Sequence, residues 1–338
     1  MSLTLSSPPL HDNAYVWLFM KGDFYLPGVF VSAFSIKRTN PDADLVVMVT
    51  PDVSEHARNM LLKVATHLYD IPYVSFESKQ LKTERQRQLY NTWIASSYTK
   101  WNSLALPYKK IALIDGDTIH TANTDELFDL QAPAMPLASP FVEPLGKIKS
   151  FYVGPTDLAG YPQHGSRIDT SILSDILNKG GLLPTSTPAI IEPSMSDYKE
   201  YLELIKGMQP FGFTECHSGF DEQSIAHFYV TKGKPYTSIH QRYNYYPWKD
   251  GFMFPGEVPR IIHFFSDTKP WTVEYNKYPD VTTWYKMAAL AIDHVAIKAE
   301  DISIKSENIS LATSVDDEFN KKFIRTLDTT HNINVVKP

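Results

Sequence analysis

The most informative segment of the chain is Ile111-Ala112-Leu113-Ile114-Asp115-Gly116-Asp117-Thr118. Its first four residues form a short apolar run that predicts a buried β-strand. Two carboxylates follow at the carboxyl end of this strand, where open α/β sheets bind their ligands. Because residues two apart on an extended chain point the same way, Asp115 and Asp117 can face one ligand. Gly116 between them leaves room for a bulky group against the backbone.

Two carboxylates directed at one point repel each other unless a cation lies between them. Mg²⁺ and Mn²⁺ suit this role, because they take oxygen ligands and can be shared with a phosphate. The chain contains one cysteine, Cys216, so a metal site must be built from Asp, Glu and His. A solvated Asp-Gly-Asp turn is the alternative interpretation, since both residue types are common in turns.

Two enzyme classes place an Asp-x-Asp pair after a strand. Haloacid-dehalogenase-like phosphatases use the first Asp as a nucleophile and require a Thr four residues later, where this chain has Ile119. They also place the pair on their first strand, whereas Asp115 follows three predicted strands. Nucleotide-sugar glycosyltransferases place it after an initial nucleotide-binding half. The second class fits this chain better.

Strand and helix patterns alternate on the N-terminal side of this segment. They predict strands over residues 15–20, 45–49 and 73–76, and helices over residues 26–38, 54–68 and 89–106. On the C-terminal side they predict a strand at 189–191, a helix from 194, a short helix after 221 and a strand at 260–265. Such alternation implies a largely parallel sheet covered by helices.

Residues 131–188 differ from the rest, because they are rich in proline and glycine and show little periodicity. A long segment without clear elements usually serves a function. We therefore expect an irregular insertion here that carries the acceptor side of the site, with His164-Gly165 as a candidate acceptor-side or lid element. From Ser303 onward the chain is polar and is interpreted as an appendage or tail.

The composition excludes several classes of protein. Of 338 residues, 43% are hydrophobic and 21% are charged, which is enough apolar material for a core and excludes bulk disorder. The net charge of −6 argues against a nucleic-acid partner. No apolar run approaches the ~20 residues that cross a bilayer, and the N-terminus lacks the pattern of a secretory signal. We expect a cytoplasmic enzyme.

A second motif is His263-Phe264-Phe265-Ser266-Asp267-Thr268-Lys269-Pro270-Trp271, which follows the strand pattern at residues 260–262. A His at a strand end can supply an imidazole to a divalent metal, and the Lys six residues later can reach a phosphate. A lone His is more often structural. Together with the Asp115/Asp117 pair, however, His263 is better interpreted as a metal ligand.

The combination of these motifs resembles glycosyltransferase family 8, the glycogenin-like and lipopolysaccharide-galactosyltransferase-like enzymes of the GT-A fold. The resemblance covers residues 15–284. It implies that Asp115, Asp117 and His263 hold Mn²⁺, with Mg²⁺ as the alternative, against the diphosphate of a UDP-sugar. It also implies that Lys269 contacts the phosphates and that Gly116 lies at the nucleotide sugar. Ser266 departs from the family pattern, which has Gly at this position.

The N-terminal loop also looks like that of the family. Family members surround the uracil with the loop after the first strand, which here runs through Met20-Lys21-Gly22-Asp23-Phe24-Tyr25. The resemblance implies that Tyr25 lies near the base and that Phe19, Lys21 and Gly22 line its pocket. Aromatic stacking on a base contributes about 1–3 kcal/mol in single-stranded nucleic-acid sites. Ordinary helix packing is the alternative for Tyr25.

Three further matches concern the sugar side of the donor. Tyr98-Thr99-Lys100-Trp101 resembles the family helix whose Lys lies near the donor's sugar and phosphates, a role that passes to Lys100, although a solvated helix Lys is the alternative. The acidic cluster Asp221-Glu222-Gln223 stands where the family has an Asp-Gln pair, and either acid aligns with the family Asp. Favourable charge at a helix start is a sufficient alternative explanation for the acids. Thr185-Ser186-Thr187 stands where the family has its Asn-containing strand entrance, which is a departure.

We therefore expect an α/β protein of the GT-A class, with a Rossmann-like nucleotide-binding half and a mixed, mostly parallel sheet flanked by helices. The expected organisation is an N-terminal extension at residues 1–14, a GT-A domain at 15–297 with the insertion at 131–188, and a polar appendage at 298–338.

The expected activity is metal-dependent, retaining transfer of a hexose or N-acetylhexosamine from a UDP-sugar to a saccharide, polyol or protein acceptor. Catalytic roles are expected for Asp221, Glu222, Gln223 and Lys269. Alternatives are a self-glycosylating initiator of the glycogenin type, an Asp-x-Asp phosphatase, or a non-catalytic UDP-sugar-binding module. Family members are often dimers, so a homodimer is a further expectation.

Overall fold

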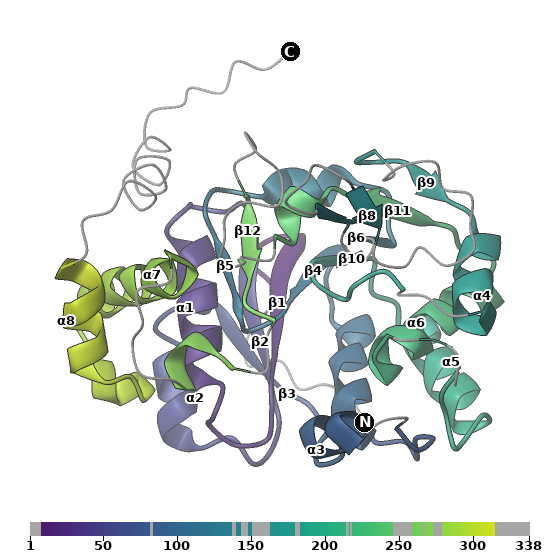
Figure 1. The fold of residues 1–338 in the computed structure, drawn as a ribbon, viewed down its shortest axis with the longest axis horizontal. Helices are drawn as coiled ribbons and strands as arrows, with labels where there is room; N and C mark the ends of the chain where they lie inside the picture. Colours follow the sequence, from purple (N-terminus) through teal and green to yellow (C-terminus); the bar gives the residue numbers. More distant parts are fainter. Residues whose placement is uncertain are drawn as a thin grey trace.

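A mixed β-sheet forms the centre of the molecule (Figure 1). The computed structural model describes residues 8–81, 84–136, 140–142, 148–150, 163–179, 183–213, 216, 218–245, 259–265, 268–272 and 279–314. Within them the main sheet has the strand order β3-β2-β1-β4-β10-β6-β11-β9. The strands are β1 (Asn13–Phe19), β2 (Asp44–Val49), β3 (His67–Asp70), β4 (Lys110–Ile114), β6 (Ala134–Pro136), β9 (Arg167–Ile168), β10 (Ala189–Ile191) and β11 (Tyr236–Ile239).

The sheet is parallel across β3, β2, β1 and β4, and β10 then joins β4 in the antiparallel sense. Two small sheets accompany it, one of β5 (Thr118–His120) with β12 (Ile261–His263), the other of β7 (Pro140–Val142) with β8 (Ile148–Ser150). The predicted α/β class with a mostly parallel sheet flanked by helices is confirmed.

Helices cover both faces of the sheet (Figure 1). The α-helices are α1 (Leu26–Lys37), α2 (Glu55–Leu61), α3 (Glu84–Tyr90), α4 (Thr170–Lys179), α5 (Met195–Lys206), α6 (Phe220–Thr231), α7 (Pro279–Val295) and α8 (Ser306–Ser314). The 3₁₀ helices are η1 (Ile94–Ala105), η2 (Asp125–Asp129), η3 (Gln241–Tyr243), η4 (Pro270–Thr272) and η5 (Ala299–Ile302).

Strand β1 shows why the helices sit where they do. Alternate side chains of a strand point to opposite faces, and both faces of β1 are apolar. Tyr15 and Trp17 enter the core shared with α1 and α7, whereas Ala14 and Val16 enter the core shared with η1, α5 and α6. The strand is therefore buried on both sides, as its continuous apolar sequence predicted.

Most predicted strands form where their patterns indicated, but one was wrong. The third strand is not residues 73–76 but His67–Asp70. Its Tyr69 is buried, and its last residue, Asp70, is exposed. Pro72 interrupts the chain just after it and has no N–H for a ladder, so the strand pattern beyond it does not join the sheet. Helix α2 begins after Ser54, whose hydroxyl accepts from the Ala57 amide, but ends at Leu61 rather than at residue 68.

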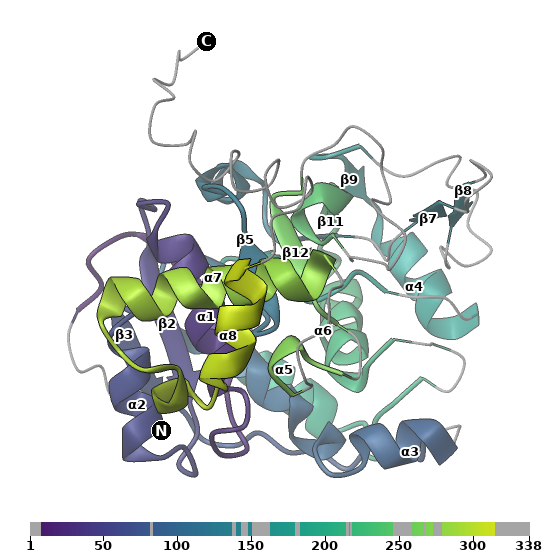
Figure 2. The same ribbon diagram turned by 60° about the vertical axis from the view of Figure 1, so that its left-hand side comes forward.

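Two other segments contain more regular structure than their sequences indicated. The described part of 131–188 holds β6, β7, β8, β9 and the helix α4, whose Leu173, Ile176 and Leu177 pack into a third apolar cluster. The region after residue 297 contains η5 and α8, and α8 lies beside α7 in both views (Figures 1 and 2). Asn308 of α8 donates to the Tyr285 hydroxyl at 2.9 Å. The domain boundaries themselves stay a prediction.

Pairing between β5 and β12 positions the candidate site. The chain turns after β4 into β5, and β12 pairs with β5 so that His263 lies opposite Thr118. This register places the His263 motif beside the Asp-Gly-Asp turn, although the two lie far apart in sequence. In the described part of the chain, no helix is long and apolar enough to cross a membrane.

Candidate active site

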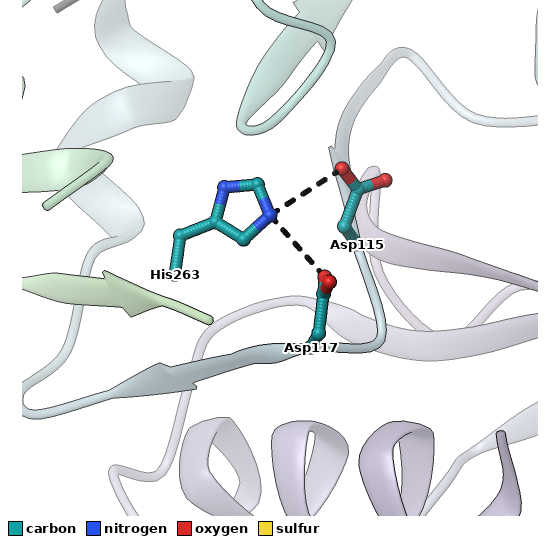
Figure 3. A group of neighbouring side chains, drawn as sticks. All are labelled: Asp115, Asp117 and His263. Carbon is teal, nitrogen blue, oxygen red and sulfur yellow. Dashed lines mark ion pairs between the residues drawn. The ribbon is translucent and has the colours of Figure 1, made fainter. Parts of the chain in front are cut away.

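Three side chains converge where β4 ends and β12 ends (Figure 3). The Nε2 atom of His263 lies 3.3 Å from Oδ1 of Asp117 and 4.0 Å from Oδ2 of Asp115. One ligand atom from each of the three residues lies within 4.8 Å of the others. Asp117 and His263 are buried, while Asp115 is partly exposed. The cluster therefore opens to solvent on the Asp115 side.

The donor set of this cluster fits a divalent cation. Two carboxylate oxygens and an imidazole nitrogen, with no sulfur, suit Mn²⁺ or Mg²⁺ better than a soft metal. The residues predicted as metal ligands are thus brought together, and each offers an atom toward the same point. The identity of the metal stays a prediction.

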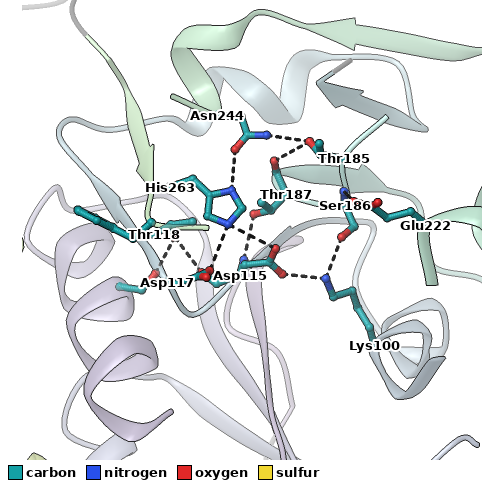
Figure 4. Close-up of polar contacts among 12 residues, drawn as sticks. Lys100, Asp115, Asp117, Thr118, Thr185, Ser186, Thr187, Glu222, Asn244 and His263 are labelled. Atoms are coloured by element: carbon teal, nitrogen blue, oxygen red, sulfur yellow. Dashed lines mark hydrogen bonds and ion pairs between the residues drawn. The ribbon is translucent and has the colours of Figure 1, made fainter. Parts of the chain in front are cut away.

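Two lysines bind the carboxylate oxygens that do not face His263. Lys269 Nζ donates to Asp117 Oδ2 at 2.6 Å and to the Phe264 carbonyl at 3.1 Å. Lys100 Nζ donates to Asp115 Oδ1 at 2.8 Å and lies 3.7 Å from Asp221 (Figure 4). The lysines thus offset the charge of both acids and leave one oxygen of each on the His263 side. Lys100, predicted near the donor, lies at the site.

The electrostatics of the buried carboxylate follow from these contacts. Burial alone would raise the pKa of Asp117, but attraction to His263 and Lys269 and hydrogen bonds from both hold it well below its usual range. For Lys100, burial acts to lower the pKa, and the carboxylates of Asp115 and Asp221 raise it above its ordinary value. Asp117 and Lys100 therefore both stay charged at neutral pH.

Gly116 and Gly28 lie where helix α1 packs against the Asp-Gly-Asp turn. A Cβ atom at Gly116 would lie 2.6 Å from Cγ2 of Val29, and one at Gly28 would lie 2.5 Å from the Trp271 ring and 2.6 Å from the Gly116 carbonyl. Helix α1 therefore approaches the Gly116 backbone on the side where a Cβ would stand, and the contact of Gly116 with the nucleotide sugar stays a prediction. The two glycines let α1 pack directly under the Asp-Gly-Asp turn.

The three residues of the acidic cluster at the start of α6 have different partners. Asp221 faces Lys100, and Glu222 accepts from the amides of Ser186 and Gly219, at 3.2 Å each. Gln223 is buried, with its amide bonded to the Ser218 carbonyl and the Phe213 amide. Both polar ends of Gln223 therefore serve the fold, and the acids reach the site.

Burial, and secondarily the nearby charge of Asp221, raises the pKa of Glu222 to about 8. A carboxyl whose pKa is higher in the folded than in the unfolded chain binds more protons in the folded chain, so its contribution to stability falls as pH rises from about 4.5 to about 8. Relative to wild type, we expect Glu222→Gln to gain up to about 5 kcal/mol of stability as pH rises through this range, since one pKa unit corresponds to about 1.36 kcal/mol.

Urea unfolding at the acidic and alkaline ends of this range measures the difference. Gln keeps one acceptor oxygen where Glu has two, so a constant offset between the variants is expected and only its change with pH is informative. An offset that is the same at both pH values would contradict the raised pKa.

The residues predicted to line the uracil pocket take three different positions. Phe19 is fully buried in the core, so its side chain offers no surface to a ligand. Lys21 and Gly22 lie in the loop after β1, both with positive φ, and Lys21 Nζ lies 5.2 Å from the centre of the Tyr73 ring. Tyr25 packs edge-on against Trp271 at 5.4 Å. Burial and the charges of Asp117 and Asp115 raise the pKa of Tyr25, so its phenol is within electrostatic reach of the metal ligands.

Several residues at this edge of the sheet escaped the sequence analysis. Asp52 accepts from the Gly22 amide at 3.1 Å and from the Tyr73 hydroxyl at 2.9 Å, which ties together the loops after β1, β2 and β3. Asn244 bonds to His263 at 2.9 Å. Their only sequence signal was a position soon after a strand, which many polar residues share.

The departures from the family pattern also have a place in the structure. Ser186 accepts from Lys100 at 2.8 Å, and the Thr187 hydroxyl accepts from the Asp115 amide at 3.0 Å (Figure 4). His164 stacks on Tyr243 with ring centres 5.3 Å apart, and its Nδ1 accepts from the His240 amide. Ser266 lies outside the described residues.

No family model matches the chain. The relatives that match the chain over about the same span include the following three. Protein R707 of Acanthamoeba polyphaga mimivirus is 28% identical over 274 residues, covering 78% of this chain and 83% of R707. Human glycogenin-1 is 24% identical over 274 residues, covering 78% of this chain and 64% of glycogenin-1. Galactinol synthase 3 of Arabidopsis thaliana is 24% identical over 264 residues, covering 77% of this chain and 73% of the synthase.

These relatives support the resemblance of the chain to the glycogenin-like glycosyltransferase family 8. The parallel strands β3, β2, β1 and β4 agree with the nucleotide-binding half of the GT-A fold expected for this family. In this chain the Asp-x-Asp pair and the downstream His motif, recognised separately in the sequence, form one cluster at the carboxyl ends of β4 and β12.

Proposed function

We propose that this protein is a metal-dependent, retaining glycosyltransferase that moves a hexose or N-acetylhexosamine from a UDP-sugar to an acceptor hydroxyl. One observation carries the proposal. Asp115, Asp117 and His263 offer three ligand atoms within 4.8 Å, and two lysines flank the acids. Such a site suits a cation together with the anionic diphosphate of a nucleotide sugar.

Asp115, Asp117 and His263 would hold Mn²⁺ or Mg²⁺, which when bound would polarise the diphosphate and stabilise it as a leaving group. Lys269 would attract the phosphates electrostatically, because its hydrogen bond to Asp117 would hold its ammonium group beside the cation. Lys100 and Asp221 would orient the donor's sugar. Preorganised charge of this kind is often the largest contribution to catalysis. The acceptor hydroxyl would attack the face that the diphosphate leaves, and the leaving oxygen would take its proton.

The nucleoside would lie over the loops after β1 and β2. Gly22, Asp52 and Tyr73 present backbone and polar groups there, and Lys21 adds a cation above the Tyr73 ring. Tyr25 stays the candidate aromatic near the base. The names of the relatives support a saccharide, polyol or protein acceptor, since the relatives include glycogenins and galactinol synthases.

The other candidate functions have less support. A phosphatase of the Asp-x-Asp type would use Asp115 as nucleophile, but one of its oxygens is bonded to Lys100 and the chain has Ile119 where such enzymes have Thr. Self-glycosylation is open to test by intact mass after incubation with UDP-glucose. A non-catalytic binding module would not need all three metal ligands. The homodimer stays an expectation of the family resemblance, and the cytoplasmic location stays an expectation of the composition.

A thermal-shift panel tests the donor class. UDP-glucose, UDP-galactose and UDP-N-acetylglucosamine are added with and without Mn²⁺, since a ligand that binds the native state stabilises it by RT ln(1 + [L]/Kd). At a concentration 100 times Kd the gain is about 2.7 kcal/mol, which raises the Tm by several degrees. We expect at least one donor to raise the Tm only when Mn²⁺ is present. GDP-mannose serves as the control, and a panel in which no UDP-sugar shifts the Tm would refute the donor class.

A further inference from the structure

A chain of hydrogen bonds runs from His263 away from the carboxylates (Figure 4). Nδ1 of His263 lies 2.9 Å from Oδ1 of Asn244, and Nδ2 of Asn244 donates to the Thr185 hydroxyl at 2.8 Å. The Thr185 hydroxyl donates to the Thr187 carbonyl at 3.3 Å. Asn244 is almost fully buried, so its amide meets protein groups rather than water.

The donor and acceptor of each of these hydrogen bonds can be assigned by starting from the Thr187 carbonyl. A carbonyl can only accept, so the single hydrogen of the Thr185 hydroxyl points at Thr187. The Thr185 oxygen then accepts, which turns the NH₂ group of Asn244 toward it. The carbonyl oxygen of Asn244 must therefore face His263, and because this oxygen only accepts, Nδ1 of His263 carries a proton.

When the ring of His263 is neutral, as a metal ligand must be, its second nitrogen is then left with a lone pair. It is this atom, Nε2, that lies 3.3 Å from Asp117 and 4.0 Å from Asp115. A neutral imidazole coordinates a metal through its unprotonated nitrogen, and a partner on the other nitrogen sets which one that is. The opposite tautomer would place a proton between the ring and the cation.

We propose that Asn244 and Thr185 are positioning residues that set the tautomer and the ring orientation of His263 for metal binding. This inference rests on the proposed function. The same segment also holds the other side of the site, because the Thr187 hydroxyl accepts from the Asp115 amide at 3.0 Å. Residues 185–187 thus support two of the three metal ligands without supplying one.

Mn²⁺ binding, followed by electron paramagnetic resonance, tests the role in metal affinity. Partners of this kind typically contribute 10–100-fold to metal affinity. We expect Asn244→Leu and Thr185→Val to weaken Mn²⁺ binding by about 10-fold or more. Thr185→Ser keeps the hydroxyl and is expected to stay within about twofold of wild type, because the relay needs only that group. Asn308→Leu, which removes a buried amide in α8 that donates to Tyr285 of α7, is the matched control.

The histidine tautomer is a second readout that does not depend on metal or activity. ¹⁵N-histidine spectra of the metal-free protein, recorded at rising pH until the His263 signals stop changing, report which nitrogen of the neutral ring is protonated. We expect Nδ1–H in wild type and Thr185→Ser, and a loss of this preference in Thr185→Val. A proton on Nε2 in wild type, or unchanged Mn²⁺ affinity in folded Asn244→Leu and Thr185→Val, would overturn the proposal. If wild type binds no Mn²⁺ even with UDP, the metal-dependent function fails, and the tautomer measurement still decides the relay.

Discussion

Asp117→Asn is expected to reduce Mn²⁺-dependent release of UDP from the donor by about 10²–10³-fold, the range seen when one preorganised electrostatic group is removed from an active site. The substitution replaces the carboxylate that lies 3.3 Å from His263 with a neutral amide, and it leaves one charged metal ligand, Asp115, where there were two. It also removes the carboxylate that Lys269 contacts at 2.6 Å. Mn²⁺ titration and a coupled assay of UDP release measure both effects.

The same substitution has a stability effect that a double variant isolates. Lys269 is buried, so Asp117→Asn leaves its ammonium without a carboxylate, which typically costs about 3–5 kcal/mol. Adding Lys269→Met removes the unpaired charge, and we expect it to restore much of the lost stability while activity stays low. Asp129→Asn, an exposed acid on η2, is the control. Mn²⁺-dependent UDP release that survives in Asp117→Asn would refute the metal assignment.

Gly28→Ala is expected to destabilise the protein by about 1–3 kcal/mol, the usual cost of forcing extra atoms into a packed interior. The new Cβ would lie 2.5 Å from the Trp271 ring and 2.6 Å from the Gly116 carbonyl, and the second contact is with backbone that cannot rotate away. Alanine favours a helix over glycine by up to about 1 kcal/mol, which the clash exceeds. Since Gly116 lies between both acidic ligands, Mn²⁺ affinity should fall together with stability.

Urea unfolding and Mn²⁺ titration of Gly28→Ala measure these two effects. Gly207→Ala is the matched control, because Gly207 has ordinary helical geometry at the end of α5 and an added Cβ would meet its nearest atom at 3.4 Å. This control is expected to be neutral or slightly stabilising. If Gly28→Ala is likewise neutral or slightly stabilising, α1 does not pack tightly against the Asp-Gly-Asp turn.

The strands that the sequence predicted well are those whose burial is nearly complete. Apart from one polar residue at the start of each, β1, β2 and β4 consist of apolar residues covered by helices on both faces, so the composition of each segment alone indicates its state. β3 was missed because its four residues, His67–Asp70, include two polar ones and lie at the edge of the sheet. Local pattern is weakest there, since pairing with β2 rather than residue type makes the strand.

For the candidate site, too, some features follow from the sequence alone and others depend on the tertiary structure. By itself the sequence determined the residue types and motifs of the cluster, Asp115, Asp117, His263 and Lys269, because carboxylates, imidazole and ammonium at strand ends carry their chemistry with them. Which groups they meet depended on the pairing of β12 with β5 and on the return of residues 185–187 beside β4. Only the tertiary structure therefore showed that Asn244 contacts His263, that Lys100 contacts Asp115, and that Gly116 makes room for a helix. These contacts join segments more than a dozen residues apart, and hydrogen-bond geometry over such separations leaves no periodic signal in a sequence.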